Sequence, residues 1–263
     1  RASAWHRLIS NVVLSLSKYL KLKKMKTVII DYKAGNVQSL LFAIERLGFS
    51  AKLTNNPDEI SKADKVIFPG VGEASFAMNS LKETKLDLLI PELKQPLLGI
   101  CLGMQLLCRD SEESETKALG IFDVSVKRFP DSVLVPQIGW NQIYDLKSDL
   151  FKNIPQQSYM YLVHSYYAEK NENTIATTDY SESYSTALQK DNFFGVQFHP
   201  EKSGVFGSKI LENFLKLWLI STTKDTKGKI KIKAFQKKTK FQINLFWTFE
   251  QLKNIKIFCA FCG

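Results

Sequence analysis

The chain has 263 residues and a formal net charge of +10, and 44% of its residues are hydrophobic. The positive charge is concentrated at the two ends: residues 1–24 carry six basic residues and no acid, and residues 222–263 carry ten lysines and two acids. Residues 25–221 therefore hold 20 basic and 24 acidic residues, which removes the electrostatic argument for a nucleic-acid partner. No apolar run reaches the ~18 residues of a membrane helix, so we expect neither a nucleic acid nor a membrane as partner.

Three regions follow from this distribution. Residues 1–24 have the basic, serine-containing composition of a transit peptide, but Met25 followed at once by a strand pattern is typical of a natural start. We therefore expect an N-terminal extension over 1–24, upstream or transit-like and outside the fold, one domain over 25–221, and a basic C-terminal appendage over 222–263.

The four cysteines form no secreted disulfide framework, which favours a reducing, cytoplasmic location. Cys259 and Cys262 have the spacing of a metal or redox motif, but they lack a second pair of ligands. We expect no metal site and no cofactor.

Strand and helix patterns alternate from residue 28 onward. Apolar, β-branched runs predict strands at 28–30, 49–53, 65–68 and 97–101, and helical spacing predicts helices over 37–47, from 57, through 78–81 and near 87–93. This alternation predicts a mostly parallel sheet covered on both faces, with the ligand at the carboxyl ends of its strands. Three loops lie at such ends, at 31–36, at 69–72 and at Cys101.

The pattern changes after Gly120. Short β-rich runs predict antiparallel strands that extend or cover the sheet, at 124–128, 141–144, 159–167, 174–178, 185–189 and 194–198. One last amphipathic helix is expected over 207–220.

Cys101 lies where a strand turns directly into a helix, with Gly99 two residues before it and Gly103 two residues after it. A tight strand-to-helix turn of this kind is a nucleophile elbow, and glycine on both flanks has a steric reason. The helix start would also favour the thiolate. The alternative is a buried cysteine that packs as a small hydrophobic residue.

A cysteine nucleophile needs a base, and His6, His164 and His199 are the three histidines of the chain. His6 lies in the N-terminal extension, and His164 lies inside a β-rich run with no acid two residues later. His199 ends a predicted strand, Pro200 favours an extended backbone there, and Glu201 would then lie on the same side and orient the imidazole. The alternative interpretation of residues 199–201 is an exposed loop histidine beside an incidental acid.

An oxyanion hole needs backbone N–H groups beside the sulfur. The N–H of Leu102 is one candidate, and the loop that contains Gly70 and Val71 could supply another, although its glycines could simply form a turn.

Two motifs carry a family resemblance. Gly-Ile-Cys-Leu-Gly-Met-Gln at 99–105 and Gln-Phe-His-Pro-Glu at 197–201 resemble the class I (triad) glutamine amidotransferases. Further segments at 31–36, 69–72, 136–141 and 161–166 resemble the glutaminase subunits of imidazole glycerol phosphate synthases, and the likeness covers roughly residues 25–220.

The resemblance implies a flavodoxin-like, three-layer α/β fold with a mostly parallel central sheet and additional antiparallel strands. It implies that Cys101 attacks glutamine, that His199 moves the proton and that Glu201 orients His199. The residues that match the glutamine pocket are Gln105, Glu113, His164, Ser165 and Tyr166.

The resemblance also implies a heterodimer in which ammonia passes to a (β/α)8-barrel synthase/cyclase subunit of histidine biosynthesis. Positions matching the partner interface are Asn36, Gln137, Trp140 and Tyr161, and Gln137 stands where many relatives carry histidine. Two alternatives remain open at this point: a paralogous subunit that feeds ammonia to another acceptor such as a sugar, and a non-catalytic binding module with basic tails.

Overall fold

The computed structural model describes residues 25–32, 37–217, 220–224, 230–234 and 242–244. The predicted N-terminal extension, Asn36, Cys259 and Cys262 therefore lie outside the described residues. Among the described residues, no helix is long and apolar enough to cross a membrane.

The chain first alternates strands and helices, as the sequence predicts. This part comprises β1 (Thr27–Ile30), α2 (Val37–Arg46), β2 (Ala51–Thr54), α3 (Pro57–Ser61), β3 (Lys65–Gly70), α4 (Ala74–Glu83), α5 (Leu86–Leu89), the 3-10 turn η1 (Ile90–Glu92), β4 (Leu97–Cys101) and α6 (Leu102–Leu106).

Strands then dominate until the last helix. They are β5 (Cys108–Ser111), β6 (Thr116–Lys117), β7 (Phe122–Arg128), β8 (Gln137–Ile143), β9 (Ser158–His164), β10 (Tyr166–Ala168), β11 (Thr174–Asp179), β12 (Ser183–Lys190) and β13 (Phe193–Val196), followed by α7 (Gly204–Lys216). Three 3-10 turns lie among them, η2 (Glu113–Glu115), η3 (Asp149–Phe151) and η4 (Pro200–Lys202). After α7, strands β14 (Ile220–Lys224), β15 (Ile230–Ala234) and β16 (Gln242–Asn244) form a separate antiparallel sheet.

The main sheet has the order β2-β1-β3-β4-β13-β12-β10-β7-β5-β6, and β11 pairs with β12. Strands β2, β1, β3, β4 and β13 run parallel to one another, whereas β12 pairs antiparallel with β13 and β10. The predicted α/β class, with parallel strands extended by antiparallel ones, is confirmed.

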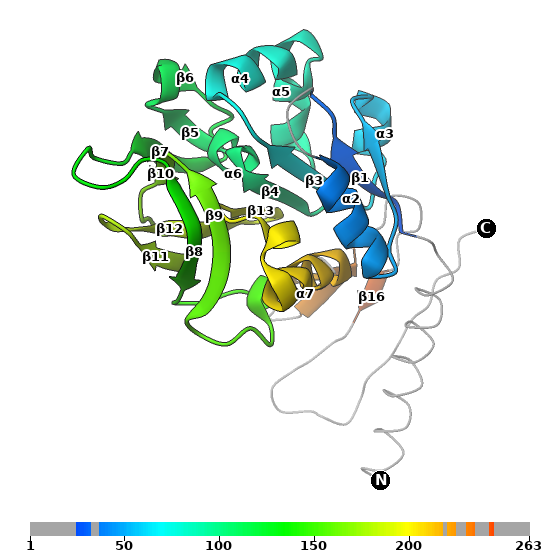
Figure 1. Cartoon of the computed structure of the whole chain (residues 1–263). Helices are drawn as coiled ribbons and strands as arrows, with labels where there is room; N and C mark the ends of the chain where they lie inside the picture. The colour runs from blue at the N-terminus through cyan, green and yellow to red at the C-terminus, as the bar shows by residue number, and fades with distance from the viewer. Residues whose placement is uncertain (1–24, 33–36, 218–219, 225–229, 235–241, 245–263) are drawn as a thin grey trace.

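The central strands are buried on both faces, so their side chains alternate between two cores. Val66 and Phe68 of β3 belong to one core, together with residues of α4 and α6, and Ile67 belongs to the other, together with residues of α2 and α7. The helices thus form layers on the two sides of the sheet, as Figure 1 shows.

One predicted strand is divided in the structure. The run 159–167 breaks at Ser165 into β9, which pairs with β8 in a separate two-stranded sheet, and β10, which joins the main sheet. The β8–β9 ribbon packs Met160 and Leu162 into the core shared with α7, so it covers the sheet rather than extending it. The last helix also begins earlier than predicted, at Gly204, and ends at Lys216.

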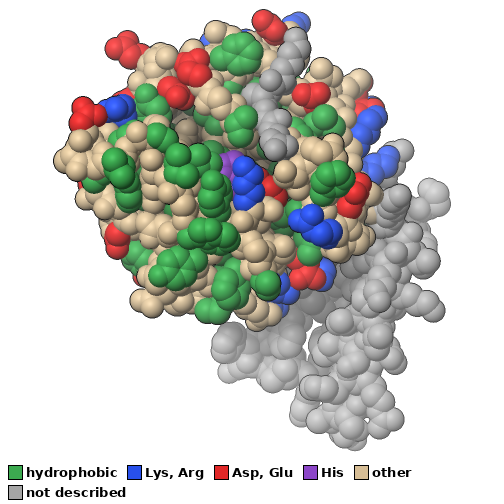
Figure 2. Space-filling view, viewed as in Figure 1, with side chains coloured by type: hydrophobic (Ala, Val, Ile, Leu, Met, Phe, Trp, Pro, Cys, Tyr) green, Lys and Arg blue, Asp and Glu red, His purple; other side chains and the backbone are tan. Residues whose placement is uncertain are grey.

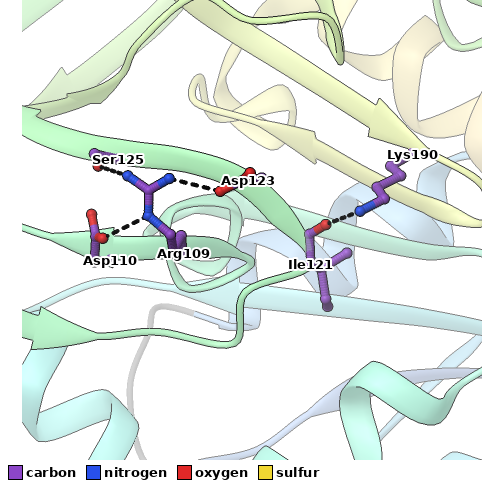
Figure 3. Close-up of polar contacts among 6 residues, drawn as sticks. All are labelled: Arg109, Asp110, Ile121, Asp123, Ser125 and Lys190. Carbon is purple, nitrogen blue, oxygen red and sulfur yellow. Dashed lines mark hydrogen bonds and ion pairs between the residues drawn. The ribbon is translucent and has the colours of Figure 1, made fainter.

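Polar contacts at the surface link β5 with β7, and β12 with the residue that precedes β7 (Figure 3). The guanidinium of Arg109 on β5 donates to the carboxylates of Asp110 and Asp123 and to the hydroxyl of Ser125 on β7. Lys190 on β12 donates its ammonium to the carbonyl of Ile121 at 2.9 Å. Exposed ion pairs of this kind contribute little to stability, because water screens them.

Candidate active site

Cys101 is the last residue of β4, and α6 begins at the next residue. Its backbone has φ 54° and ψ −115°, a region that L residues other than glycine rarely occupy. A strained residue at the carboxyl end of a parallel strand is the signature of a nucleophile elbow. The helix that follows has only five residues, so the case for a nucleophile rests on the geometry of the turn and not on a long helix.

The two flanking glycines are required by close backbone approach. A Cβ on Gly99 would lie 2.8 Å from the carbonyl oxygen of Gly103, and a Cβ on Gly103 would lie 1.9 Å from the carbonyl oxygen of Phe68. Both distances are far below van der Waals contact. The steric role predicted for these two glycines is therefore present in the structure.

His199 and Glu201 form a buried pair directly after β13. The Nδ1 atom of His199 lies 2.9 Å from Oε1 of Glu201, and both side chains are less than a tenth exposed. The backbone of His199 is extended, as its position before Pro200 predicts, with φ −95° and ψ 98°. Glu201, however, lies in the 3-10 turn η4, so the turn rather than strand alternation brings its carboxylate to the ring.

Neighbouring groups determine the charge of His199. Burial by itself lowers the pKa of this imidazole, but the interactions with Cys101 and Glu201 outweigh burial and raise the pKa to about 10. His199 is therefore a cation at neutral pH, which allows it to stabilise a thiolate on Cys101 and to deliver a proton.

The sulfur of Cys101 has two polar contacts of its own. In its thiol form Sγ donates to the carbonyl of Val163 at 3.8 Å, and it accepts from Nε2 of Gln197 at 3.7 Å. The Nε2 atom of His199 is buried and has no hydrogen-bond partner among the described residues.

His164 is not arranged as a base. One ring nitrogen lies 2.7 Å from the carbonyl of Tyr166 and the other lies 3.2 Å from the hydroxyl of Tyr184, so both are occupied. Burial, with a smaller contribution from the charge of His199, lowers the pKa of His164 to about 4 in spite of its bond to Tyr166. His164 is a neutral, structural histidine beside the site.

The other residues matched to the glutamine pocket come from different elements of the fold. Gln105 is buried beside the nucleophile, and its Nε2 donates to the carbonyl of Tyr166 at 2.8 Å. Glu113 lies in η2 and reaches the start of α4, where its Oε2 accepts from the backbone N–H of Ala74 at 2.8 Å. Burial raises the pKa of Glu113 and the bond from Ala74 opposes the rise. Ser165 lies at the break between β9 and β10, where its carbonyl accepts from the N–H of Phe129.

The loop expected to contribute oxyanion donors is adjacent to the nucleophile. Gly70 is the register partner of Cys101 across the parallel pair β3–β4, and Leu102 follows Cys101 directly. A small cavity opens beside this loop, lined by Leu40, Pro69, Gly70, Val71, Ile100, His199, Glu201 and Lys202.

The residues matched to a partner surface differ in exposure. Trp140 is 55% exposed on β8 and meets Tyr161 edge to face with ring centroids 6.1 Å apart. The ammonium nitrogen of Lys202 lies over the Tyr161 ring, 5.8 Å from its centroid. Gln137 is buried instead, and its side-chain amide lies 2.9 Å from the hydroxyl oxygen of Tyr184.

The sequence analysis missed two buried residues of the site. Gln197 lies in the motif that carries His199, and Tyr32 donates its hydroxyl to the carbonyl of Pro69 at 2.8 Å. Both lie in segments that resemble the family, 197–201 and 31–36, but a polar residue's position along the chain does not show whether its side chain turns toward a sulfur or a loop.

A cysteine on an elbow beside a buried histidine–glutamate pair, at the carboxyl edge of an α/β sheet, defines the class of triad thiol enzymes. The model of the family "Glutamine amidotransferase class-I" matches residues 28–218. This chain belongs to that family of enzymes.

Proteins that are similar to this chain support the same family. The imidazole glycerol phosphate synthase subunit HisH of Bacteroides fragilis is 54% identical over 196 residues, which are 73% of this chain and 100% of that protein. The same subunit of Escherichia coli is 47% identical with the same coverage. Among solved structures, PurLQS from Thermotoga maritima has a TM-score of 0.59 at 17% identity and covers 73% of this chain and 98% of its own, so it supports the fold alone.

Proposed function

We propose that this chain is the glutaminase subunit of an imidazole glycerol phosphate synthase of histidine biosynthesis. It hydrolyses glutamine to glutamate and ammonia and passes the ammonia to a (β/α)8-barrel synthase/cyclase subunit, in the cytoplasm. The buried Cys101, His199 and Glu201 at one strand edge carry this proposal. The identities of 54% and 47% to HisH subunits over their whole lengths support the choice of pathway.

The chemistry follows from the side chains. The Cys101 thiolate attacks the carbonyl carbon of the glutamine side-chain amide, and the oxygen gains charge that backbone N–H groups near Leu102 and the Gly70–Val71 loop stabilise. His199, kept protonated by Glu201, gives its proton to the leaving nitrogen, and ammonia departs. Water then attacks the thioester, His199 takes its proton, and glutamate leaves with the thiolate restored.

In this scheme Gln105, Glu113 and the backbone of 164–166 hold the amino-acid end of glutamine. Two observations support this: the Nε2 atom of Gln105 donates to the carbonyl of Tyr166 at 2.8 Å, and the pKa of Tyr166 is raised, chiefly by burial and to a smaller extent by the charge of Glu113.

The partner would dock on the face that carries the β8–β9 ribbon. Large hydrophobic side chains are exposed there, with Ile138 63%, Trp140 55% and Tyr159 52% exposed. An open groove continues this surface toward α7, lined by Trp140, Pro155, Gln156, Gln157, Ser158, Tyr159, Ser203, Gly204, Val205 and Phe206. Figure 2 shows hydrophobic side chains spread over the face on which a histidine is visible. Apolar exposure of this extent is typical of a protein-binding surface, and a buried Gln137 would act on such a partner only through its neighbours.

The test is glutamine turnover by the full chain, alone and with the barrel subunit and its nucleotide ligand. We expect low turnover alone and strong activation by the partner. Full turnover that ignores the partner would reject the proposal in favour of a different ammonia acceptor. Complementation of a histidine auxotroph distinguishes this pathway from a paralogue that serves a sugar-modifying enzyme.

The Cys101→Ala chain is the matched control. It should fold and bind the partner but release no ammonia from glutamine, and the complex should still use free ammonium.

A further inference from the structure

Gln197 is a fully buried side chain inside the site to which the triad chemistry gives no role. It follows β13 directly, and its backbone N–H donates to the carbonyl of Thr186 at 2.8 Å. Its side-chain amide lies between Gln105 and Cys101, with 3.0 Å to the first and 3.7 Å to the sulfur.

The orientation of this amide is determined by its neighbours. The carbonyl of Tyr166 can only accept, so the end of Gln105 that lies 2.8 Å from it must be the nitrogen. That nitrogen also faces the Gln197 amide, so Gln197 must present its oxygen to Gln105. The nitrogen of Gln197 consequently points at the sulfur, and an N–H donor faces Cys101.

We propose that Gln197 is a positioning residue for the nucleophile: its amide N–H donates to the Cys101 sulfur and stabilises the thiolate, and Gln105 holds that amide in place. The inference rests on the proposed function in one respect, because it takes Cys101 as the nucleophile. It adds a chain of hydrogen bonds that runs from the carbonyl of Tyr166 through the amides of Gln105 and Gln197 to the sulfur of Cys101.

The physical effect of such a donor is specific. A hydrogen bond to a charged acceptor is stronger than one to a neutral acceptor, so the amide favours the thiolate over the thiol. The carbonyl oxygen of Val163, 3.8 Å from the sulfur, can only accept a hydrogen bond and therefore favours the thiol instead. Removing the donor while leaving Val163 shifts the balance toward the thiol.

The experiment measures alkylation of Cys101 by iodoacetamide in the full chain as a function of pH. The rate follows the thiolate fraction, so its pH midpoint reports how well the site stabilises the anion. The Cys101→Ala chain, which keeps Cys108, Cys259 and Cys262, supplies the background rate. Cys108 is fully buried, which raises the pKa of its thiol and makes it a slow competitor.

Two variants of similar shape remove the donor in different ways. Gln197→Met removes the hydrogen bond, and we expect the midpoint to rise by about one pH unit, with alkylation about tenfold slower below it. Gln197→Glu replaces the donor by an acidic group, so the midpoint should rise further. A loss of packing alone would not produce the order Gln, Met, Glu.

A third variant tests this chain of hydrogen bonds. Gln105→Met should raise the midpoint by less than Gln197→Met, and the double variant should add nothing to Gln197→Met, because both act on one N–H group.

The matched control is Gln189→Met on β12, which removes a side-chain amide that accepts from Ser148 at 2.6 Å, away from Cys101. Its midpoint should equal that of the unaltered chain. An unchanged midpoint in Gln197→Met, or an equal shift in Gln189→Met, would overturn the inference. The alkylation readout needs neither glutamine nor a partner, so this failure is distinct from a failure of the proposed function, which appears as missing turnover in the unaltered complex.

Discussion

Gly103→Ala tests the close approach that forms the elbow. An added methyl would lie 1.9 Å from the Phe68 carbonyl oxygen and 2.9 Å from its carbonyl carbon, so α6 and β3 would have to separate by about 1 Å or more. Alanine in a helix is favoured over glycine by about 1 kcal/mol, whereas overpacking of this kind costs about 1–3 kcal/mol or more. Because the contact is with backbone, which cannot rotate away, the steric cost should exceed the helical gain by about 2 kcal/mol.

The consequence should appear in activity as well as stability. Phe68 belongs to the strand that ends at Gly70, the register partner of Cys101, so separation moves the loop away from the nucleophile. Unfolding in urea and glutamine turnover in the complex measure the two effects. Gly48→Ala is the control: an added methyl there meets nothing within 4 Å, and its φ of +79° costs about 1–2 kcal/mol in stability without touching turnover. Gly103→Ala with unchanged or higher stability would refute the steric account of the elbow.

The remaining predictions concern charge and the partner surface. Because His199 has a pKa raised to about 10, its stabilising contribution is complete below about pH 6.5 and is lost as pH rises toward 10. Glu201→Gln should therefore lower the unfolding free energy most at pH 6.5 and least above pH 10, and equal losses at both pH values would contradict the pair. His164 has a pKa lowered to about 4, so stability should fall as pH drops from 6.5 to 4, by up to about 1.4 kcal/mol per unit, and His164→Gln should flatten that slope in urea titrations. Trp140→Ala should reduce partner-stimulated turnover at least tenfold while leaving Cys101 alkylation unchanged, and a parallel loss of alkylation would place Trp140 in the site instead of the interface.

The parallel half of the fold could be predicted because its signals are local. Strand runs such as 65–68 are apolar throughout, and the helices between them have clear spacing, so the alternation indicates the α/β class without further information. The break at Ser165 could not be predicted, because both sides of it are β-rich and the change of sheet depends on which other strands they pair with, β8 for β9 and β7 for β10. Pairing partners are a property of the whole fold.

The site shows the same division. Cys101 and its glycines could be recognised because an elbow imposes steric requirements on consecutive residues. The sequence predicts the pairing of His199 with Glu201 from an extended backbone, whereas in the structure a 3-10 turn brings the two side chains together. Gln197 is adjacent to this pair in sequence, yet its direction toward the sulfur is set by Gln105 on a different element.

Strand β9 connects the proposed partner surface with the candidate catalytic residues. Tyr161 pairs in register with the exposed Trp140, and its backbone carbonyl accepts from the N–H of His199 at 3.0 Å. Two residues further along the same strand, the carbonyl of Val163 contacts the Cys101 sulfur. A partner that shifts this ribbon would therefore move groups that touch both the base and the nucleophile, without any change in the parallel sheet that carries Cys101. The parallel sheet carries the nucleophile, whereas the separate β8–β9 ribbon carries the backbone groups that, under the proposed function, a docked subunit would move.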